Sequence, residues 1–132
     1  MPTTPDLLPE LEAACDKLLW RSETDSPFEV VFLPSGQKSE PIAQLLNQYP
    51  ADTSVTISSL NDFFAPAMIE RAWFDSRELE RVQRYRNLRD LLETTLENLQ
   101  VYRIGETEID VYMLGVTEDK QVVGVKTKVV ET

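Results

Sequence analysis

The chain has 132 residues, and its 13 Lys and Arg against 23 Asp and Glu give a formal net charge of −10. Because it contains no histidine and a single cysteine, Cys15, the composition excludes imidazole catalysis, an intrachain disulfide and a thiolate zinc site. The acidic balance disfavours direct binding to nucleic acid, which relies on clustered Lys and Arg, whereas it suits a basic protein partner or simply keeps a small protein in solution.

The N-terminal sequence lacks the cationic and apolar regions of a secretory signal, and no stretch approaches the roughly 18 apolar residues of a membrane span. We therefore expect a cytoplasmic protein in a reducing compartment, without a membrane partner. A chain of this length buries roughly two-thirds of the surface that it exposes when unfolded. This is enough for one domain, residues 1–132, with its own hydrophobic core.

Residues 6–19 predict a first amphipathic helix, because their leucines recur at three- and four-residue spacings. Cys15 falls among these leucines, so we expect it to pack in the core rather than serve as a reactive thiol. Small polar residues at 22–27 predict a loop, and the aromatic and β-branched run at 28–33 predicts a buried strand.

A short second helix is predicted from Ser39 to about Tyr49, where a proline follows the first residues of the segment as at a helix start. Residues 54–58 predict a second strand. Ser59 is expected to cap a short helical turn that ends before Pro66.

Residues 65–74 carry no clear periodic pattern, and we assign no element to them. The strongest periodic signal runs from about Ser76 to Leu99, where apolar residues recur every three to four positions and predict a long helix. About 24 residues at ~1.5 Å each would extend ~36 Å, enough to cross one face of a small sheet. The opposite face is rich in Arg, Asp and Glu, so we expect it to face water.

After this helix the pattern changes to alternation, which predicts strands at 101–105, 108–116 and 121–130. Turns are expected at 105–107 and 117–120. Three consecutive strands with short connections form an antiparallel meander.

The order of elements favours the α/β class, because helices flank the strands and one long helix precedes the meander. We expect a three-layer α/β/α sandwich around a mixed, largely antiparallel sheet that ends in the C-terminal meander. The sequence contains no repeat, low-complexity tract or interdomain linker.

Without histidine, an enzyme would need carboxylates, a serine–lysine pair or a metal held by oxygen ligands alone. Carboxylates at Asp75, Glu78, Asp90 and Glu93 are available, but they lie on the charged face of the long helix, where such residues are ordinary. No phosphate-binding glycine loop and no nucleophile motif is found. The sequence therefore predicts a non-enzymatic binding protein without a cofactor.

Three features could serve recognition: acids in the first polar loop, aromatic residues in the irregular central segment, and a chain end directly after a strand. Six residues are therefore candidates for partner binding: Glu23, Asp25, Trp73, Phe74, Glu131 and Thr132. Each also has a structural explanation. The loop acids could be solvated, Trp73 could be a hydrophobic plug over the core, and the terminus could be frayed.

The segments LLWRSETDSPFEV, AWFD and VYRIGETEIDVYMLGVTEDKQVVGVKTKVVET together resemble the nuclease A inhibitor family of cyanobacteria and other bacteria. The match covers nearly the whole chain, and its most specific parts are QVYRIGETEIDVYMLG and TKVVET. The resemblance implies an α/β/α protein that binds and blocks a sugar-non-specific, Mg²⁺-dependent endonuclease of the ββα-metal type, one-to-one, and that is a monomer when free.

The resemblance also implies roles for single residues. The C-terminal end, matched here by Glu131 and Thr132, enters the nuclease active site and approaches its Mg²⁺, which prefers hard oxygen ligands. Glu23 and Trp73 match two other contact positions, and tryptophan is a frequent interface anchor. One position departs from the pattern of the inhibitory members, where an acidic residue precedes this tryptophan and the present chain has Ala72.

Two other functions stay open from the sequence. The first is a protein-interaction module that keeps the fold but binds a different basic partner, which the departure at Ala72 would suit. The second is a carboxylate-based metalloenzyme. An inhibitor would hold no metal of its own, because its ligands to the metal converge only in the complex.

Overall fold

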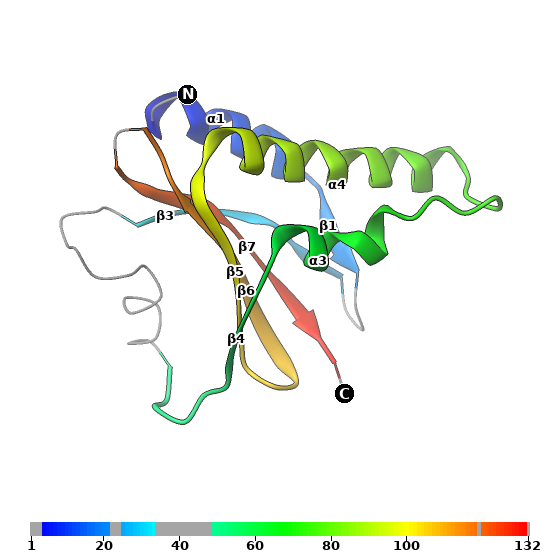
Figure 1. The fold of residues 1–132 in the computed structure, drawn as a ribbon. Helices are drawn as coiled ribbons and strands as arrows, with labels where there is room; N and C mark the ends of the chain where they lie inside the picture. Colours follow the sequence, from blue (N-terminus) through cyan, green and yellow to red (C-terminus); the bar gives the residue numbers. More distant parts are fainter. Residues whose placement is uncertain (1–3, 22–24, 34–48, 119, 132) are drawn as a thin grey trace.

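A computed structural model describes residues 4–21, 25–33, 49–118 and 120–131. Figure 1 shows helices gathered over one side of a twisted sheet, with β7 running to the C-terminus. In chain order the elements are α1 (Thr4–Cys15), β1 (Leu19–Arg21), β2 (Asp25–Pro27), β3 (Glu29–Leu33), β4 (Val55–Ser58), α3 (Leu60–Phe64), the 3₁₀ helix η1 (Ala65–Met68), α4 (Ser76–Thr95), β5 (Glu97–Ile104), β6 (Glu108–Val116) and β7 (Val122–Val130).

The main sheet has five strands in the order β3-β7-β6-β5-β4, and β1 and β2 form a separate two-stranded sheet. Every pair of strands in the described residues is antiparallel. The three longest strands are consecutive in the chain and form the predicted C-terminal meander. The α/β class and the largely antiparallel sheet are thus confirmed.

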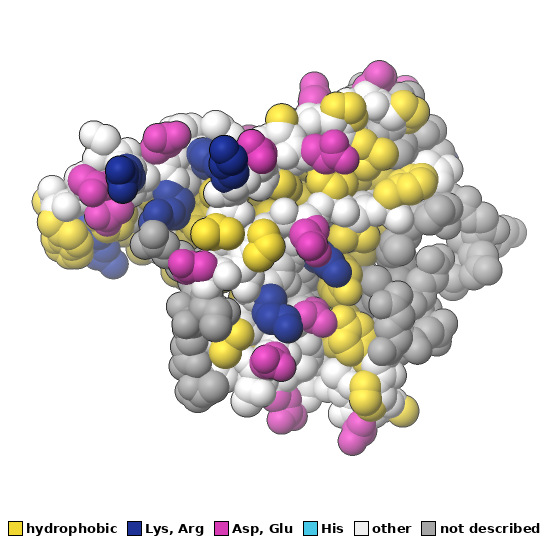
Figure 2. Space-filling model, turned by 180° about the vertical axis from the view of Figure 1, so that it is seen from behind, with side chains coloured by type: hydrophobic (Ala, Val, Ile, Leu, Met, Phe, Trp, Pro, Cys, Tyr) yellow, Lys and Arg dark blue, Asp and Glu magenta, His cyan; other side chains and the backbone are white. Residues whose placement is uncertain are grey.

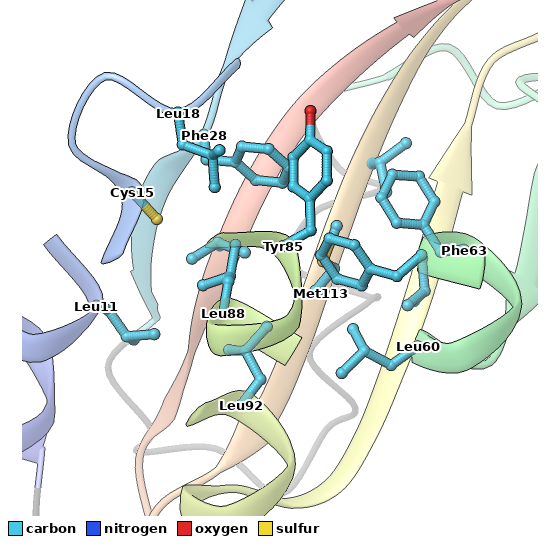
Figure 3. Close-up of a cluster of buried hydrophobic side chains, with 14 of the residues drawn as sticks. Leu11, Cys15, Leu18, Phe28, Leu60, Phe63, Tyr85, Leu88, Leu92 and Met113 are labelled. Carbon is cyan, nitrogen blue, oxygen red and sulfur yellow. The ribbon is translucent and has the colours of Figure 1, made fainter. Parts of the chain in front are cut away.

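The main core lies between the sheet and the helices, because alternate residues of the strands point to this side. On β6, Ile109, Val111 and Met113 belong to this core. Figure 3 shows Leu88 and Leu92 of α4 near Met113. Buried side chains of α1 and α3 surround them, together with Phe28, which directly precedes β3. Helices α1, α3 and α4 therefore share one face of the sheet.

A smaller cluster covers the opposite face and contains Tyr102, Ile104, Tyr112 and Leu114. Tyr49 packs against it, donates a hydrogen bond to Asp110 Oδ2 at 2.5 Å and lies 3.2 Å from the Tyr112 hydroxyl. Burial, followed by these two hydrogen bonds, raises the pKa of the Tyr49 hydroxyl. Residues 39–48 of the second predicted helix, which is expected to run from Ser39 to about Tyr49, lie outside the described residues.

Two predicted N-terminal boundaries are wrong. The first helix ends at Cys15 instead of residue 19, because Lys17 adopts a left-handed conformation (φ 59°) that a helix cannot continue through. The chain then forms β1, which pairs with β2 inside the segment predicted to be a loop. Cys15 itself is buried, as predicted, and burial raises the pKa of its thiol to about 11 although Arg84 acts in the opposite direction.

The helix predicted to end at Leu99 stops at Thr95, and the chain continues directly into β5. Its start is as expected, because Asp75 Oδ1 accepts a hydrogen bond from the Glu78 amide at 2.9 Å and caps α4. The predicted cap at Ser59 is confirmed, since its hydroxyl accepts from the Asp62 amide at 3.1 Å. In the described part of the chain, no helix has the length and apolar character needed to cross a membrane.

Candidate functional site

The end of β7 is fixed to the turn between β5 and β6. The Glu131 amide donates to the Thr107 carbonyl at 2.8 Å, and Arg103 Nη2 donates to Glu131 Oε1 at 2.9 Å. Gly105 shapes this turn at φ 118°, where an added Cβ would lie 2.4 Å from the Glu108 carbonyl oxygen. Glu131 is therefore held in place and not frayed, whereas Thr132 lies outside the described residues.

The same end of the sheet is acidic. Glu106, Glu108 and Glu131 are exposed there, and Ser54 Oγ donates to Glu106 Oε1 at 3.0 Å. The guanidinium of Arg103, which lies on β5 with β6 between it and β7, pairs with one of these three carboxylates, that of Glu131. A surface of this charge attracts a cationic partner at long range.

The hairpin of β1 and β2 carries Asp25, whose side chain is exposed. In the hairpin register Asp25 lies opposite Arg21. The hairpin is attached to the main sheet, because Thr127 Oγ1 of β7 donates to the Ser26 carbonyl at 3.4 Å. Glu23 falls between the two strands and lies outside the described residues.

Trp73 stands on a turn just before α4. The Phe74 amide donates to the Arg71 carbonyl at 3.0 Å and closes the turn. The indole is 75% exposed, with the Arg71 guanidinium 5.9 Å from its centroid and the Phe74 ring edge-on at 6.3 Å. The interpretation of Trp73 as a plug over the core is wrong, and Ala72 is exposed beside it.

A cavity of ≈ 220 Å³ separates this turn from the body of the molecule, and Phe74 and Trp20 both line it. Trp20 of β1 in turn stacks on Phe63 at 4.3 Å and 24°. β7 therefore contacts the hairpin, and Trp20 of the hairpin faces Phe74 of the Trp73 turn across the cavity. In Figure 1 the C-terminus lies below α3 and β1, and the segment that leads into α4 projects away to the right.

The carboxylates of α4 were the candidates for catalysis. Among the described residues, no group of three or more His, Cys, Asp or Glu side chains that could hold a metal ion occurs. Asp75 caps α4, and Asp90 accepts from Arg89 at 2.9 Å, so these carboxylates act within the helix. This agrees with the prediction that the charged helix face is ordinary.

Sequence reasoning did not single out Trp20, Ile69 or Arg71 as parts of the site. Ile69 is 48% exposed and lines the cavity with the other two. The available signal was the run of apolar and aromatic residues through 65–74, which fits neither a helical nor a strand period. Such residues either fill an irregular part of the core or stand on the surface for recognition.

A family model described as nuclease A inhibitor-like protein matches residues 5–132 of the chain. The match begins in α1 and runs to the end of the chain, so it includes the hairpin, the Trp73 turn and the terminus after β7. No curated protein matches the chain significantly. The similarity inferred from the sequence segments is thereby confirmed over nearly the full length.

Proposed function

Because this chain belongs to the nuclease A inhibitor-like family, we propose that it inhibits a sugar-non-specific, Mg²⁺-dependent DNA and RNA endonuclease of the ββα-metal type. It binds this nuclease one-to-one and covers the active site, with its C-terminal end directed at the metal of the nuclease. The family is one of inhibitors, which indicates that the chain acts by binding and not by catalysis.

The charge of the chain supports this partner. A nuclease that holds polyanions has a cationic groove, and the chain carries a net charge of −10. Exposed carboxylates of Glu106, Glu108 and Glu131 surround the end that would enter the groove. Long-range attraction between the two surfaces speeds encounter and orients the acidic end toward the active site.

The chain end supplies the groups that act at the metal. Glu131 is tied to Thr107 and Arg103, so it anchors the end of the chain. The hydroxyl and the α-carboxylate of Thr132 are then the oxygen ligands that reach toward Mg²⁺, which favours hard oxygen donors. Displacing or fixing water on the metal removes the nucleophile and excludes the phosphate of the substrate.

The second contact is the Trp73 turn, where the Phe74 ring lies edge-on to the indole. Glu23 and Asp25 are proposed as further contacts. The exposure of Trp73, 75% of its surface, is the observation that carries the proposal furthest. An exposed tryptophan on a hydrogen-bonded turn contributes little to folding but offers a large apolar anchor to a partner.

A titration tests the proposal directly. The chain is added to a purified sugar-non-specific, Mg²⁺-dependent nuclease while cleavage of plasmid DNA and of RNA is followed. We expect both activities to fall together and to reach their end point near one chain per nuclease. If both activities persist and size-exclusion chromatography detects no complex, the proposal is wrong.

Ala72 favours an alternative, a module of the same fold that binds a different basic protein. The resemblance implies an acidic residue at this position in inhibitory members, and Ala72 leaves the Trp73 turn without that charge. Affinity capture from the source cells distinguishes the two functions. Recovery of a nuclease supports inhibition, and recovery of other basic proteins alone supports the alternative.

A further inference from the structure

A second surface of the molecule is basic, although the chain as a whole is strongly acidic. A pocket of ≈ 170 Å³ lies between the end of α1 and the first half of α4. Its lining includes four cations, Lys17, Arg77, Arg81 and Arg84, and one carboxylate, Glu80. We propose that this pocket binds the phosphate group of a small anion, either inorganic phosphate or a small phosphate monoester.

The four cations differ from the other arginines of α4 in their partners. Arg86 pairs with Glu70 at 3.3 Å and Arg89 with Asp90 at 2.9 Å. Within the described ranges, none of the four cations of the pocket has a carboxylate oxygen within 4.0 Å. Their charges are therefore available to an anion from outside.

One guanidinium is already oriented. Arg84 Nη2 donates to the carbonyls of Ala14 at 3.0 Å and Asp16 at 2.6 Å, at the end of α1. This nitrogen makes both bonds, and the remaining N–H donors of Arg84 have no partner in the part of the chain that the structure describes. A planar group held in this way loses little freedom when it binds an oxyanion.

Two of the cations occupy positions that do not favour folding. Lys17 adopts φ 59°, a left-handed conformation that is uncommon for residues other than glycine, asparagine and aspartate. Arg77 lies in the first turn of α4, where the positive end of the helix dipole repels a cation. Residues whose conformation or charge is unfavourable for folding often occur at binding sites.

The size and composition of the pocket suit a phosphate. Its volume is below the range of about 300–1,000 Å³ that is typical of pockets for larger organic ligands. Arg matches the oxygen geometry of phosphate with paired donors, while Lys adds a point charge. Figure 2 shows Lys and Arg side chains along the projecting end of the molecule, mixed with acidic ones, which argues for a local site and not for a nucleic-acid track.

The test is an NMR titration of the full chain with inorganic phosphate and, separately, with glycerol 3-phosphate, at constant ionic strength set with chloride. We expect saturable shifts of the resonances around Lys17 and Arg77 in the low millimolar range. Tighter binding of glycerol 3-phosphate assigns the site to a monoester, and equal binding assigns it to the free ion. Thermal melting is not used as the readout, because phosphate stabilises folded proteins generally through exclusion from their surface.

Two variants probe the pocket without disturbing the Arg84 contacts. Lys17→Asn removes the charge and keeps a residue that tolerates the left-handed conformation. Arg77→Gln removes an exposed cation from the first turn of α4. We expect each to weaken binding by about threefold to fivefold, and the double variant to bind more weakly than either single variant.

Lys128→Gln is the matched control, because it removes one exposed cation from β7 and should leave the affinity unchanged. The absence of saturable shifts overturns the proposal. So does an affinity that falls equally in the control and in the pocket variants, since only the net charge would then matter. Each result is independent of nuclease inhibition.

Discussion

The C-terminal meander and the Trp73 turn hold their candidate residues by different means. Glu131 continues β7, the strand paired between β3 and β6, and a backbone hydrogen bond and an ion pair fix it. Trp73 stands on a turn closed by the hydrogen bond from Phe74 to Arg71, with most of its surface in water. The first region can place a group accurately, and the second can adapt a large apolar surface to a partner.

The largest effect on stability is expected from a substitution that disrupts the packing of the C-terminal meander. At Gly124 of β7, an added Cβ would lie 1.8 Å from the Met113 carbonyl oxygen on β6. Gly124→Ala should lower the free energy of unfolding by about 3 kcal/mol or more, measured by urea denaturation. Lys128→Ala on the same strand, with its exposed side chain, should change it by less than about 0.5 kcal/mol. Equal stabilities would mean that β6 and β7 are not packed as described.

Deleting Glu131 and Thr132 removes the two residues proposed to enter the nuclease active site and leaves β7 intact. Folding loses one ion pair and one backbone hydrogen bond, so the stability should fall by no more than about 1–2 kcal/mol. Binding to the nuclease should weaken by more, about 2–3 kcal/mol, and inhibition should suffer more than affinity. A short tag after Thr132 should do similar damage. If the full-length, truncated and tagged proteins inhibit equally, the chain end does not block the nuclease active site.

Trp73→Ala tests the role of the Trp73 turn in binding. It should cost at least ~2 kcal/mol of binding to the nuclease, measured by calorimetry, and change the stability by less than about 1 kcal/mol. Trp20→Ala is the matched comparison, because the other tryptophan of the chain stacks on Phe63 and borders the core. That variant should lose about 3 kcal/mol or more of stability. A destabilised Trp73→Ala protein with normal binding would remove this turn from the interface.

Charge should act on both regions through the rate of association. Between low and physiological salt, where the Debye length falls to ~8 Å, we expect the association rate constant with the nuclease to drop by about tenfold, with the dissociation rate changing less. Stopped-flow fluorescence of Trp73, with Trp73→Ala as a blank, measures both rates. A rate constant that is independent of salt excludes electrostatic steering.

The smallest effect concerns Ala72, which is exposed beside Trp73. Ala72→Glu places a carboxylate at the tip of the turn and should strengthen binding to the nuclease by about 0.5–1 kcal/mol, because the groove is cationic. Ala72→Gln has nearly the same shape without the charge and should leave the affinity near that of the natural chain. If both variants bind equally, the acidic residue of the inhibitory members does not act through its charge.

Alternation made the meander predictable from the sequence, because β5, β6 and β7 each send one set of side chains to the helices and the other set away. The ends of the helices were harder to predict from the sequence. Leu18 and Leu99 continue the helical spacing of α1 and α4, but both contact the core from outside the helices. Leucine is compatible with both periods, so spacing alone cannot locate these boundaries.

The candidate site was predicted in its residues more than in its geometry. Periodicity gave no sign that Trp73 is exposed, because the packing of aromatic side chains depends on neighbours that are distant in sequence, such as Trp20, which lines the same cavity as Phe74. Nor could it reveal the pairing of Glu131 with Arg103, which are 28 positions apart. The partner-binding roles of all six candidate residues stay predictions.

Gly105 illustrates how binding can depend on a residue that has no side chain to contact the partner. The turn that it permits brings the Thr107 carbonyl to the amide of Glu131, so the position of the chain end depends on a residue about a fifth of the chain length earlier. A bulkier residue there would shift the chain end without altering a single contacting side chain. Screens for lost inhibition would then recover this position together with the contact residues, and a map of the interface drawn from such a screen would extend beyond the true footprint.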